Sequence, residues 1–284
     1  MASGFEPHHT EKPIKFKCVA SKPHASIVAP SYSSMTAHNS EPSPETKRPA
    51  FVARAARGLW RLVFDRSYRN LMRLRLLPPT GVFQPFNDTG ADRYSKIFGF
   101  VQLALGATKE IRILSYGCST GEEVFSLRGY FPHAVIKGID INAGNIAVCR
   151  RRLKEKPDAA MSFERASSME AEPAAFYDAI FAMAVLRHGN LGLPGVTRCD
   201  HLIRFDEFAR VVEDFGRCLK LGGLLVIRHS NFRLTDAPAA IAFETILRVE
   251  NAKTAKKTPI FGPDNLLMAG VEYPDTVFRK TGVA

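Results

Sequence analysis

The chain has 284 residues, 45% of them hydrophobic, and a formal net charge of +11 at pH 7. This length allows one α/β domain with extensions, or at most two small domains. The chain has no run of about 18 apolar residues, no basic-then-apolar leader and no C-x-x-C pair among its five cysteines. We therefore expect a cytoplasmic protein without a transmembrane segment, a secretion signal or a disulfide framework.

The first 46 residues are rich in Ser, Pro, His and Lys and have few periodic hydrophobic residues. Such a segment cannot bury enough apolar surface to offset the entropy that ordering would cost. We predict that residues 1–46 are a disordered N-terminal segment.

A basic segment follows and holds most of the positive charge. Residues 47–75 contain nine Lys or Arg and one acid, so they contribute +8 of the net charge. Apolar residues recur there near helical spacing, and we predict a basic helical extension over residues 47–106. We expect this extension to pack on the domain that follows it in the chain or to cover the binding site of that domain. The alternative is a surface that meets a membrane or an acidic partner. No aromatic-interleaved pattern accompanies the charge, so sequence-specific nucleic-acid binding is not expected.

Residues 111–141 have the size and pattern of a βαβ unit. A short β-branched run after Ile111 predicts a buried parallel strand. The small residues Gly-Cys-Ser-Thr-Gly at 117–121 predict a tight turn, and the helical pattern after them ends at Pro132. Residues 134–141 predict a second strand. We therefore expect strand, turn, helix and strand in that order.

The turn and the second strand carry residues suited to a nucleoside. Gly117 and Gly121 allow the backbone to approach a ligand closely. Asp140, near the tip of the second strand, is placed to accept hydrogen bonds from a ribose diol. A pyrophosphate cradle normally has three glycines, whereas here Glu122 and Glu123 follow the second glycine and would repel a phosphate. These acids suit a ligand with ammonium and sulfonium charges, such as S-adenosylmethionine.

The sequence Gly-Cys-Ser-Thr-Gly-Glu-Glu before an apolar helix resembles class I S-adenosylmethionine-dependent methyltransferases, and is most similar to the chemotaxis-receptor methyltransferases. The resemblance covers residues 89–231, about half the chain. It implies a Rossmann-like, doubly wound, mostly parallel seven-stranded sheet with helices on both faces. It also implies that the glycine loop approaches the methionine part of the cofactor, that Asp140 binds the ribose and that Glu122 binds the ammonium group. Many class I members have an acid two residues before the first glycine, where this chain has Ser115.

The resemblance also implies further cofactor contacts. The loop after the third predicted strand (162–166) contains Ser167 and Ser168, at the place where the family contacts adenine; the alternative is ordinary turn residues. Thr89, Arg93 and Tyr94 lie in a segment that often folds over the cofactor, and the alternative is a helix cap and a surface arginine. The predicted cofactor-binding set is Ser115, Gly117, Cys118, Gly121, Glu122, Asp140, Ile141, Ser167, Ser168 and Ala184.

The second half of the chain continues the α/β alternation. Asn142 is a predicted helix cap, and residues 177–184 form a strongly apolar fourth strand. A helix over 205–221 is expected to end at the two glycines 222–223, before a fifth strand at 224–228. A further helix is predicted over 238–248. Residues 260–261 and 273–279 supply the last two strands, one of them antiparallel.

The acceptor is harder to predict. Residues 181–186 are similar to the F-C-R-N-V-L motif of the chemotaxis branch, with Met183 and Ala184 in place of two polar residues. No N/D-P-P-Y/F motif is present there, which counts against methylation of DNA adenine or protein glutamine. No receptor-docking domain is evident. We therefore predict O- or N-methylation of a small molecule, with a protein acceptor as the alternative.

Methyl transfer depends mainly on holding the acceptor atom in line with the methyl group of the cofactor, and less on acid–base catalysis. If the acceptor must lose a proton, His188 and His229 are the predicted bases, with His201 a further candidate and a structural role the alternative for each. His188, Cys199 and His201 form a conceivable metal set, but their spacing is not a usual zinc pattern, so no metal is predicted. Cys118 is interpreted as a packing residue rather than a nucleophile.

The prediction is a methyltransferase domain at residues 107–284 that uses S-adenosylmethionine. Two rivals remain. A dinucleotide-dependent oxidoreductase is disfavoured by the missing third glycine and the two acids after the loop. A non-catalytic module would bind a partner or an anionic surface through the basic helix. The sequence does not indicate an oligomeric state.

Overall fold

The computed structural model describes residues 60, 63, 72, 83–84, 90, 92–106, 110–250 and 258–282. The predicted disordered segment 1–46 lies outside these residues, as does Thr89. Most of the predicted basic segment also lies outside them, although Trp60, Val63 and Met72 are helical. None of the described helices is long and apolar enough to cross a membrane.

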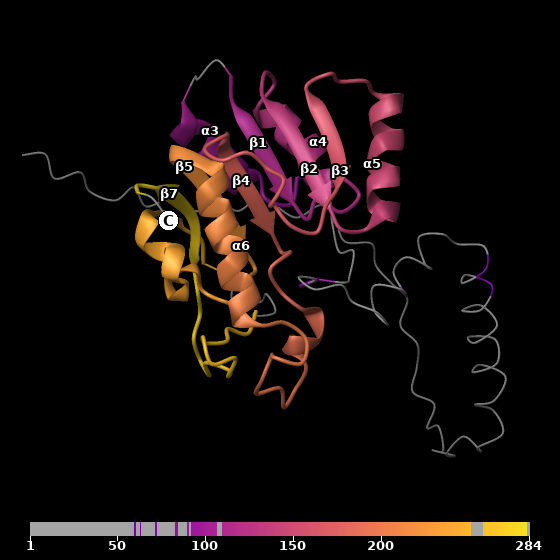
Figure 1. Cartoon of the computed structure of the whole chain (residues 1–284). Coiled ribbons are helices and arrows are strands. Elements are labelled where there is room, and N and C mark those ends of the chain that lie inside the picture. The colour runs from indigo at the N-terminus through magenta and orange to yellow at the C-terminus, as the bar shows by residue number, and fades with distance from the viewer. Residues whose placement is uncertain are drawn as a thin grey trace, which may run out of the picture. The chain divides into compact units, whose positions relative to one another are not determined.

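A seven-stranded sheet forms the core, with the strand order β3-β2-β1-β4-β5-β7-β6 (Figure 1). Five strands run parallel, and β7 pairs antiparallel with both β5 and β6. This is the predicted fold class. The order reverses between β1 and β4, so the carboxyl ends of these strands flank the crevice where doubly wound sheets bind ligands. The strands are β1 (Arg112–Tyr116), β2 (Val135–Asp140), β3 (Met161–Arg165), β4 (Tyr177–Met183), β5 (Leu219–Arg228), β6 (Phe243–Arg248) and β7 (Asp275–Lys280).

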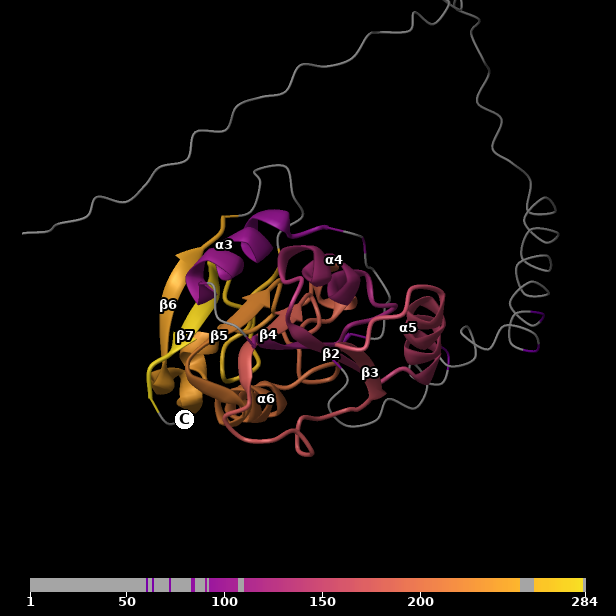
Figure 2. The same cartoon turned by 90° about the horizontal axis from the view of Figure 1, so that it is seen from above.

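Helices cover both faces of the sheet. Figure 2 shows α3 (Ser95–Leu105) and α4 (Glu122–Tyr130) on the side opposite to α6 (Phe205–Cys218). The helix α5 (Ala143–Glu155) shares a buried apolar cluster with α3 and α4, whereas α6 packs in a second cluster. Neighbouring residues of a strand enter different clusters, as Ile113 and Leu114 do, because successive side chains of a strand point to opposite faces.

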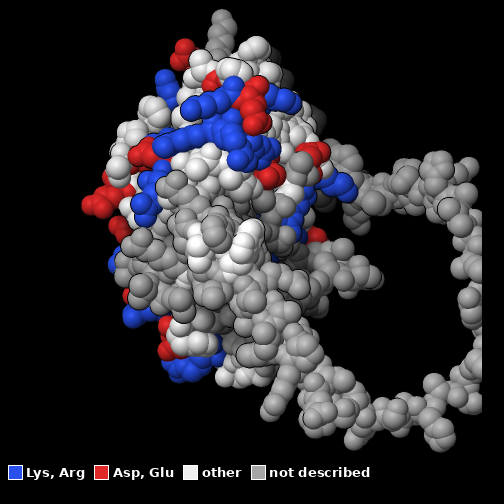
Figure 3. Space-filling model, turned by 90° about the vertical axis from the view of Figure 1, so that its right-hand side faces the viewer, with Lys and Arg blue, Asp and Glu red and all other residues white. Residues whose placement is uncertain are grey.

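The helix α5 begins where its sequence predicts. The Asn142 side chain caps it by accepting a hydrogen bond from the Gly144 backbone N–H. Ile146 is buried against the sheet, whereas Arg150, Arg151 and Lys154 are exposed. Figure 3 shows Lys and Arg side chains gathered on the face of the molecule where α5 lies.

The junction between α6 and β5 differs from the prediction. The helix ends at Cys218, and β5 already begins at Leu219, which pairs with Tyr177. The Lys220 ammonium also bonds both oxygens of Asp178, at 2.7 and 2.9 Å. Gly222 has φ +78° and lies in an irregularity of this strand rather than at a helix terminus. Strand pairing and the lysine contact therefore outweigh the local helix-stop signal.

The predicted helix over 238–248 is also wrong. Its first part is a short 3₁₀ turn, η4 (Pro238–Ala242), and the rest is the strand β6. Phe243, Thr245 and Leu247 pair with β7, which would otherwise be an edge strand. Residues 260–261 form no strand: Phe261 makes only an isolated bridge with Leu267. Apart from the earlier start of β5, the other predicted strands agree with the structure to within two residues.

Candidate functional site

The glycine loop connects β1 to α4 at the carboxyl end of the sheet. Gly117 and Gly121 have φ values of +74° and +91°, a region that side chains disfavour. A Cβ atom on Gly117 would lie 2.8 Å from the Cβ of Val185, and closer still to its Cγ2. A Cβ on Gly121 would lie 3.1 Å from the Cys149 sulfur. Both backbone conformation and packing therefore call for glycine at these two positions.

Asp140 ends β2 and ties the glycine loop to α5. Its side chain is buried and accepts hydrogen bonds from the Ser119 backbone N–H (2.9 Å), the Asn142 backbone N–H (2.8 Å) and the Asn145 side chain (3.1 Å). Burial raises the pKa of Asp140, and these three hydrogen bonds oppose the rise. A carboxylate has about four acceptor positions, so one is available for a further donor. The predicted contact with a ribose hydroxyl is chemically compatible with this geometry.

The hydroxyl of Ser119 lies in the same loop. It is buried and has no hydrogen-bond partner among the described residues. A buried hydroxyl without a partner is costly, and a polar ligand atom would satisfy it. The loop therefore offers a ligand the Ser119 hydroxyl in addition to the Asp140 carboxylate.

Glu123 supplies a second carboxylate to the site. Its Oε1 atom accepts a hydrogen bond from the Ser115 hydroxyl at 2.7 Å, and Ser115 is fully buried in β1. Burial raises the pKa of Glu123 to about 7, against the opposing effect of the Ser115 hydrogen bond. Many class I methyltransferases have an acid at the position of Ser115. Here an acid from α4 reaches that position instead.

Glu122 points elsewhere. Its carboxylate pairs with Arg152 of α5 at 3.0 Å and accepts a hydrogen bond from the Thr120 hydroxyl at 2.7 Å. The sequence analysis gave the ammonium group to Glu122 and did not consider Glu123. Helical spacing could have drawn attention to Glu123, which is four residues before the buried Leu127 and shares its helix face.

The remaining predicted cofactor residues have mixed surroundings. Cys118 is buried, and a hydrogen bond with Cys149, together with burial, holds the pKa of its thiol well above the usual value. Ser167 and Ser168 are exposed. Ala184 has φ +56° and donates its backbone N–H to the Arg228 carbonyl at 2.8 Å. The Ile141 carbonyl accepts a hydrogen bond from Arg165 at 3.3 Å.

The two predicted bases have different environments. His188 is buried, and its Nδ1 accepts a hydrogen bond from the Asn190 backbone N–H at 3.3 Å, at the start of the short helix η2 (Gly189–Gly192). Burial, and to a lesser extent His201, lower the pKa of His188. His229 follows β5, and its ring centroid is 6.0 Å from that of Tyr94. Burial and three arginines lower the pKa of His229 to about 4. His188 therefore caps a turn, whereas His229 packs beside Tyr94 at the carboxyl end of β5.

Cys199 and His201 do not complete a metal site with His188. Within the described part of the chain, no three His, Cys, Asp or Glu side chains form a group that could hold a metal ion. Cys199 is buried, with its pKa raised to about 12 mainly by burial, and His201 is exposed.

Comparisons with known proteins concern the same part of the chain. A family model described as a methyltransferase domain matches residues 107–265, more than half of the chain. No curated protein matches. Among solved structures, the chain is similar to YcgJ from Bacillus subtilis (15% identity, TM-score 0.36), and the match covers 47% of this chain and 50% of that one.

Two further structures are similar at the same level. Phosphoethanolamine N-methyltransferase 2 of Haemonchus contortus, in complex with S-adenosyl-L-methionine, is 14% identical (TM-score 0.38; 58% of this chain and 34% of that one). The [4+2]-cyclase SpnF is 20% identical (TM-score 0.37; 58% and 57%). The chain thus spans less than two thirds of each of these proteins. By its match to the family model, the chain belongs to the methyltransferase domain family.

Proposed function

We propose that this protein is a methyltransferase that uses S-adenosylmethionine, bound at the carboxyl ends of β1 and β2, to methylate an oxygen or nitrogen atom of a small molecule. The observation that carries the proposal is the pair of carboxylates, Asp140 and Glu123, on either side of a loop that requires glycine. When bound, S-adenosylmethionine supplies an electrophilic methyl group and its own leaving group. The protein then has to hold the acceptor in line and exclude water.

Each residue of the loop has a distinct task in this proposal. Gly117 and Gly121 allow the methionine part of the cofactor to approach the backbone. Asp140 binds the ribose hydroxyls. Glu123 receives the ammonium group, a role that the family resemblance alone would have given to Glu122. The Ser115 hydrogen bond orients the Glu123 carboxylate.

His229 borders the acceptor. With a pKa of about 4, its imidazole is neutral near pH 7 and cannot carry a positive charge at low cost. It can accept a hydrogen bond from an acceptor O–H or N–H and orient the lone pair toward the methyl group. We assign His229 to orientation of the acceptor and His188 to the structure of its loop.

A small acceptor suits the described surroundings. A pocket adjoins the end of β5 and is lined by His229, Ser230, Ile260 and Tyr273, among others. A protein acceptor remains the alternative, through a single side chain. We do not extend the proposal to receptor glutamates, because Met183 and Ala184 replace the polar residues of the chemotaxis-receptor branch.

The proposed location is the cytoplasm. The four free cysteines among the described residues are all buried.

Titration of S-adenosylhomocysteine into Glu123→Gln and Glu122→Gln, by calorimetry, tests the proposal. A hydrogen bond between charged groups contributes about 1.5–3 kcal/mol, so we expect Glu123→Gln to weaken binding about 10- to 150-fold. Glu122→Gln removes the same charge one residue away and is expected to change the dissociation constant less than threefold. Failure of the folded wild-type protein to bind S-adenosylhomocysteine or S-adenosylmethionine would contradict the proposed function.

A further inference from the structure

The segment before α3 connects α4 to the end of β5. The Asp92 backbone N–H donates to the Ser126 hydroxyl at 3.0 Å, and the Tyr130 hydroxyl donates to the Asp92 carboxylate at 2.9 Å. Ser126 and Tyr130 belong to α4, which begins at the glycine loop. Two residues after Asp92, the ring centroid of Tyr94 lies 6.0 Å from that of His229, which follows β5. Residues 92–94 therefore cross from α4 to the carboxyl end of β5.

A second set of contacts leads from His229 back to the glycine loop. The Ala184 backbone N–H donates to the Arg228 carbonyl at 2.8 Å, which joins the residues after β4 to the end of β5. The next residue, Val185, packs so closely beside Gly117 that a Cβ atom on that glycine would lie 2.8 Å from the Val185 Cβ. Residues 184–185 therefore lie between the glycine loop and the end of β5.

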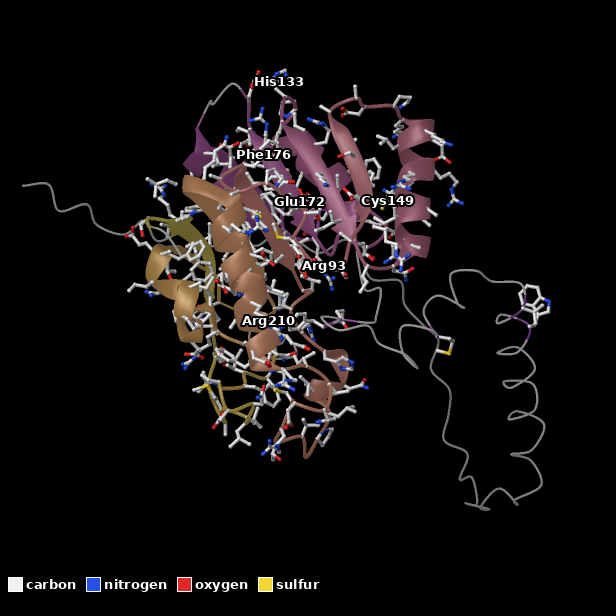
Figure 4. All side chains as sticks on the ribbon, in the orientation of Figure 1. Arg93, His133, Cys149, Glu172, Phe176 and Arg210 are labelled. Atoms are coloured by element: carbon white, nitrogen blue, oxygen red, sulfur yellow. The ribbon has the colours of Figure 1, made fainter. Side chains whose placement is uncertain are left out.

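Together these contacts form a closed circuit. It runs from the glycine loop through α4, residues 92–94, the end of β5 and residues 184–185, and back to the loop. In Figure 4, Arg93 lies near the arrowhead ends of the parallel strands, whereas His133 lies toward the opposite ends. The circuit is thus at the carboxyl ends of the strands, and a ligand on the glycine loop has the rings of Tyr94 and His229 across from it.

Tyr94 brings a buried hydroxyl to this circuit. Its ring packs edge-on against Phe98 (6.3 Å between centroids), which in turn packs against Phe181 of β4 at 5.6 Å. The hydroxyl oxygen is buried and has no hydrogen-bond partner among the described residues. Burial raises the pKa of Tyr94, and the Glu123 carboxylate adds to this rise, so the hydroxyl lies within electrostatic reach of that carboxylate. A buried hydroxyl without a partner is costly, and a polar group of a ligand would satisfy it.

His229 adds a second polar group beside Tyr94. Its backbone has φ +55°, a left-handed conformation that is uncommon for residues other than glycine. Such conformations cost free energy and cluster at ligand-binding sites. The imidazole is neutral near pH 7, so one of its ring nitrogens accepts a hydrogen bond. Tyr94 and His229 thus present two neutral hydrogen-bond acceptors from neighbouring rings.

The chemistry of the reacting atom determines how these two groups can be used. That atom needs a free lone pair to attack the methyl group, and a hydrogen bond donated to it would withdraw electron density from the lone pair. Tyr94 and His229 therefore serve the reacting atom best by accepting hydrogen bonds from it. A hydroxyl group has one hydrogen atom and satisfies only one of them, whereas a primary amine has two and satisfies both.

We propose that Tyr94 and His229 bind the two N–H groups of a primary amine, so that the enzyme N-methylates small amines. This inference rests on the proposed function, because it assigns the acceptor of the same site. The amine nitrogen forms a bond to the methyl carbon, and the methyl–sulfur bond breaks with its electron pair left on the sulfur. The methylated nitrogen then loses one proton to water. The two hydrogen bonds hold the lone pair in line with the methyl group.

Sinefungin tests this inference without a known acceptor. It has an amino group on carbon where S-adenosylmethionine has a methyl group on sulfur, whereas S-adenosylhomocysteine has neither. Calorimetry compares the two ligands in the full-length wild type, in Tyr94→Phe and in His229→Phe. Each variant loses a hydrogen bond to a charged amino group, so we expect its affinity for sinefungin to fall at least tenfold. The affinity for S-adenosylhomocysteine is expected to change less than threefold.

Tyr177→Phe is the matched control. It also removes a tyrosine hydroxyl, but that hydroxyl donates to Glu172, and Tyr177 is the first residue of β4, at the amino end of the strand. We expect both affinities to change less than threefold in this variant. The three arginines that act on His229 are present in every protein compared, so their repulsion of the amino group cancels.

The outcomes separate this inference from the proposed function. If the wild type binds neither ligand, both fall. If it binds S-adenosylhomocysteine, and Tyr94→Phe leaves the affinity for sinefungin unchanged or weakens both ligands equally, the cofactor assignment stands and the amine inference is overturned. Circular dichroism establishes that each variant is folded. If His229→Phe does not fold, Tyr94→Phe is the decisive variant, because it removes a single oxygen atom.

Discussion

Neighbouring residues of the glycine loop and α4 differ in their roles because the backbone turns them in different directions. Glu122 and Glu123 are about 100° apart on the helix, so one meets α5 and the other meets β1. The sequence contains both acids, and the packing of α4 gives them different contacts. Asp140 was predictable, because the spacing of a strand–turn–helix–strand unit places it beside the loop, where the Ser119 N–H contacts it at 2.9 Å.

Two glycines, Gly117 and Gly195, allow the cost of a left-handed backbone to be distinguished from the cost of a clash with a neighbouring side chain. Gly117 and Gly195 have similar φ values, +74° and +79°, but a Cβ atom would clash with Val185 only at Gly117. We expect Gly195→Ala to lower the free energy of unfolding by about 1–2 kcal/mol, the usual cost of a left-handed residue. Gly117→Ala is expected to cost more and to weaken the binding of S-adenosylhomocysteine at least tenfold. Denaturation in urea and calorimetry measure the two effects. If the two substitutions changed stability and ligand affinity equally, close packing at Gly117 would not be needed for the ligand to approach the loop.

At the scale of elements, the sequence prediction was wrong where contacts between residues far apart in the chain decide the structure. Two glycines after a helical pattern normally indicate a helix terminus. Here Leu219 already pairs with Tyr177, and Lys220 pairs with Asp178, which lies 42 residues away in the chain. The strand β6 was missed because its partner β7 follows only after the residues between 248 and 275, so no local pattern indicates the pairing. Local patterns predicted the central parallel strands β1 and β4, since these are buried on both faces and appear in the sequence as apolar runs.

Asp178 joins three strands at their amino ends. It accepts hydrogen bonds from the Arg112 backbone N–H (2.8 Å) and from the Lys220 ammonium. We expect Asp178→Ala to lower the free energy of unfolding by about 1–3 kcal/mol, because the Arg112 N–H loses its acceptor. Lys220→Met leaves that bond intact and removes a partly exposed ion pair, which should cost less than about 1 kcal/mol. Urea denaturation compares the two variants, and a larger loss in Lys220→Met would show that the ion pair is the stronger contact.

At the scale of the whole molecule, the effect of three arginines on His229 was not predictable from the sequence. Arg93, Arg187 and Arg228 lie in unrelated segments, and no spacing rule connects them. The neighbouring strands β4 and β5 bring Arg187 and Arg228 toward the same end of the sheet, and Arg93 acts on the pKa of His229 together with them. His229 was predicted as a base because an unperturbed imidazole has a pKa near neutrality. Burial, together with the three arginines, lowers the pKa of His229 to about 4, so its imidazole is neutral near pH 7.

The stability of the whole molecule should depend on pH through Glu123 and His229, with opposite signs. The pKa of Glu123 rises from 4.5 to about 7 on folding, so between these values the folded state binds more protons, and stability falls as pH rises. The pKa of His229 falls from 6.5 to about 4, so between these values the folded state binds fewer protons, and stability rises with pH.

Glu123→Gln isolates the first of these contributions, because His229 is the same in both proteins. The melting temperature of the wild type minus that of Glu123→Gln is expected to decrease as pH rises from 4.5 to 7 and to be constant above it. Saturating S-adenosylhomocysteine should reduce this slope, because its ammonium group favours the ionised carboxylate. Thermal denaturation over this pH range, with and without the ligand, measures both effects. A pH-independent difference would place the Glu123 pKa near its ordinary value, whereas a slope that the ligand leaves unchanged would separate Glu123 from the cofactor.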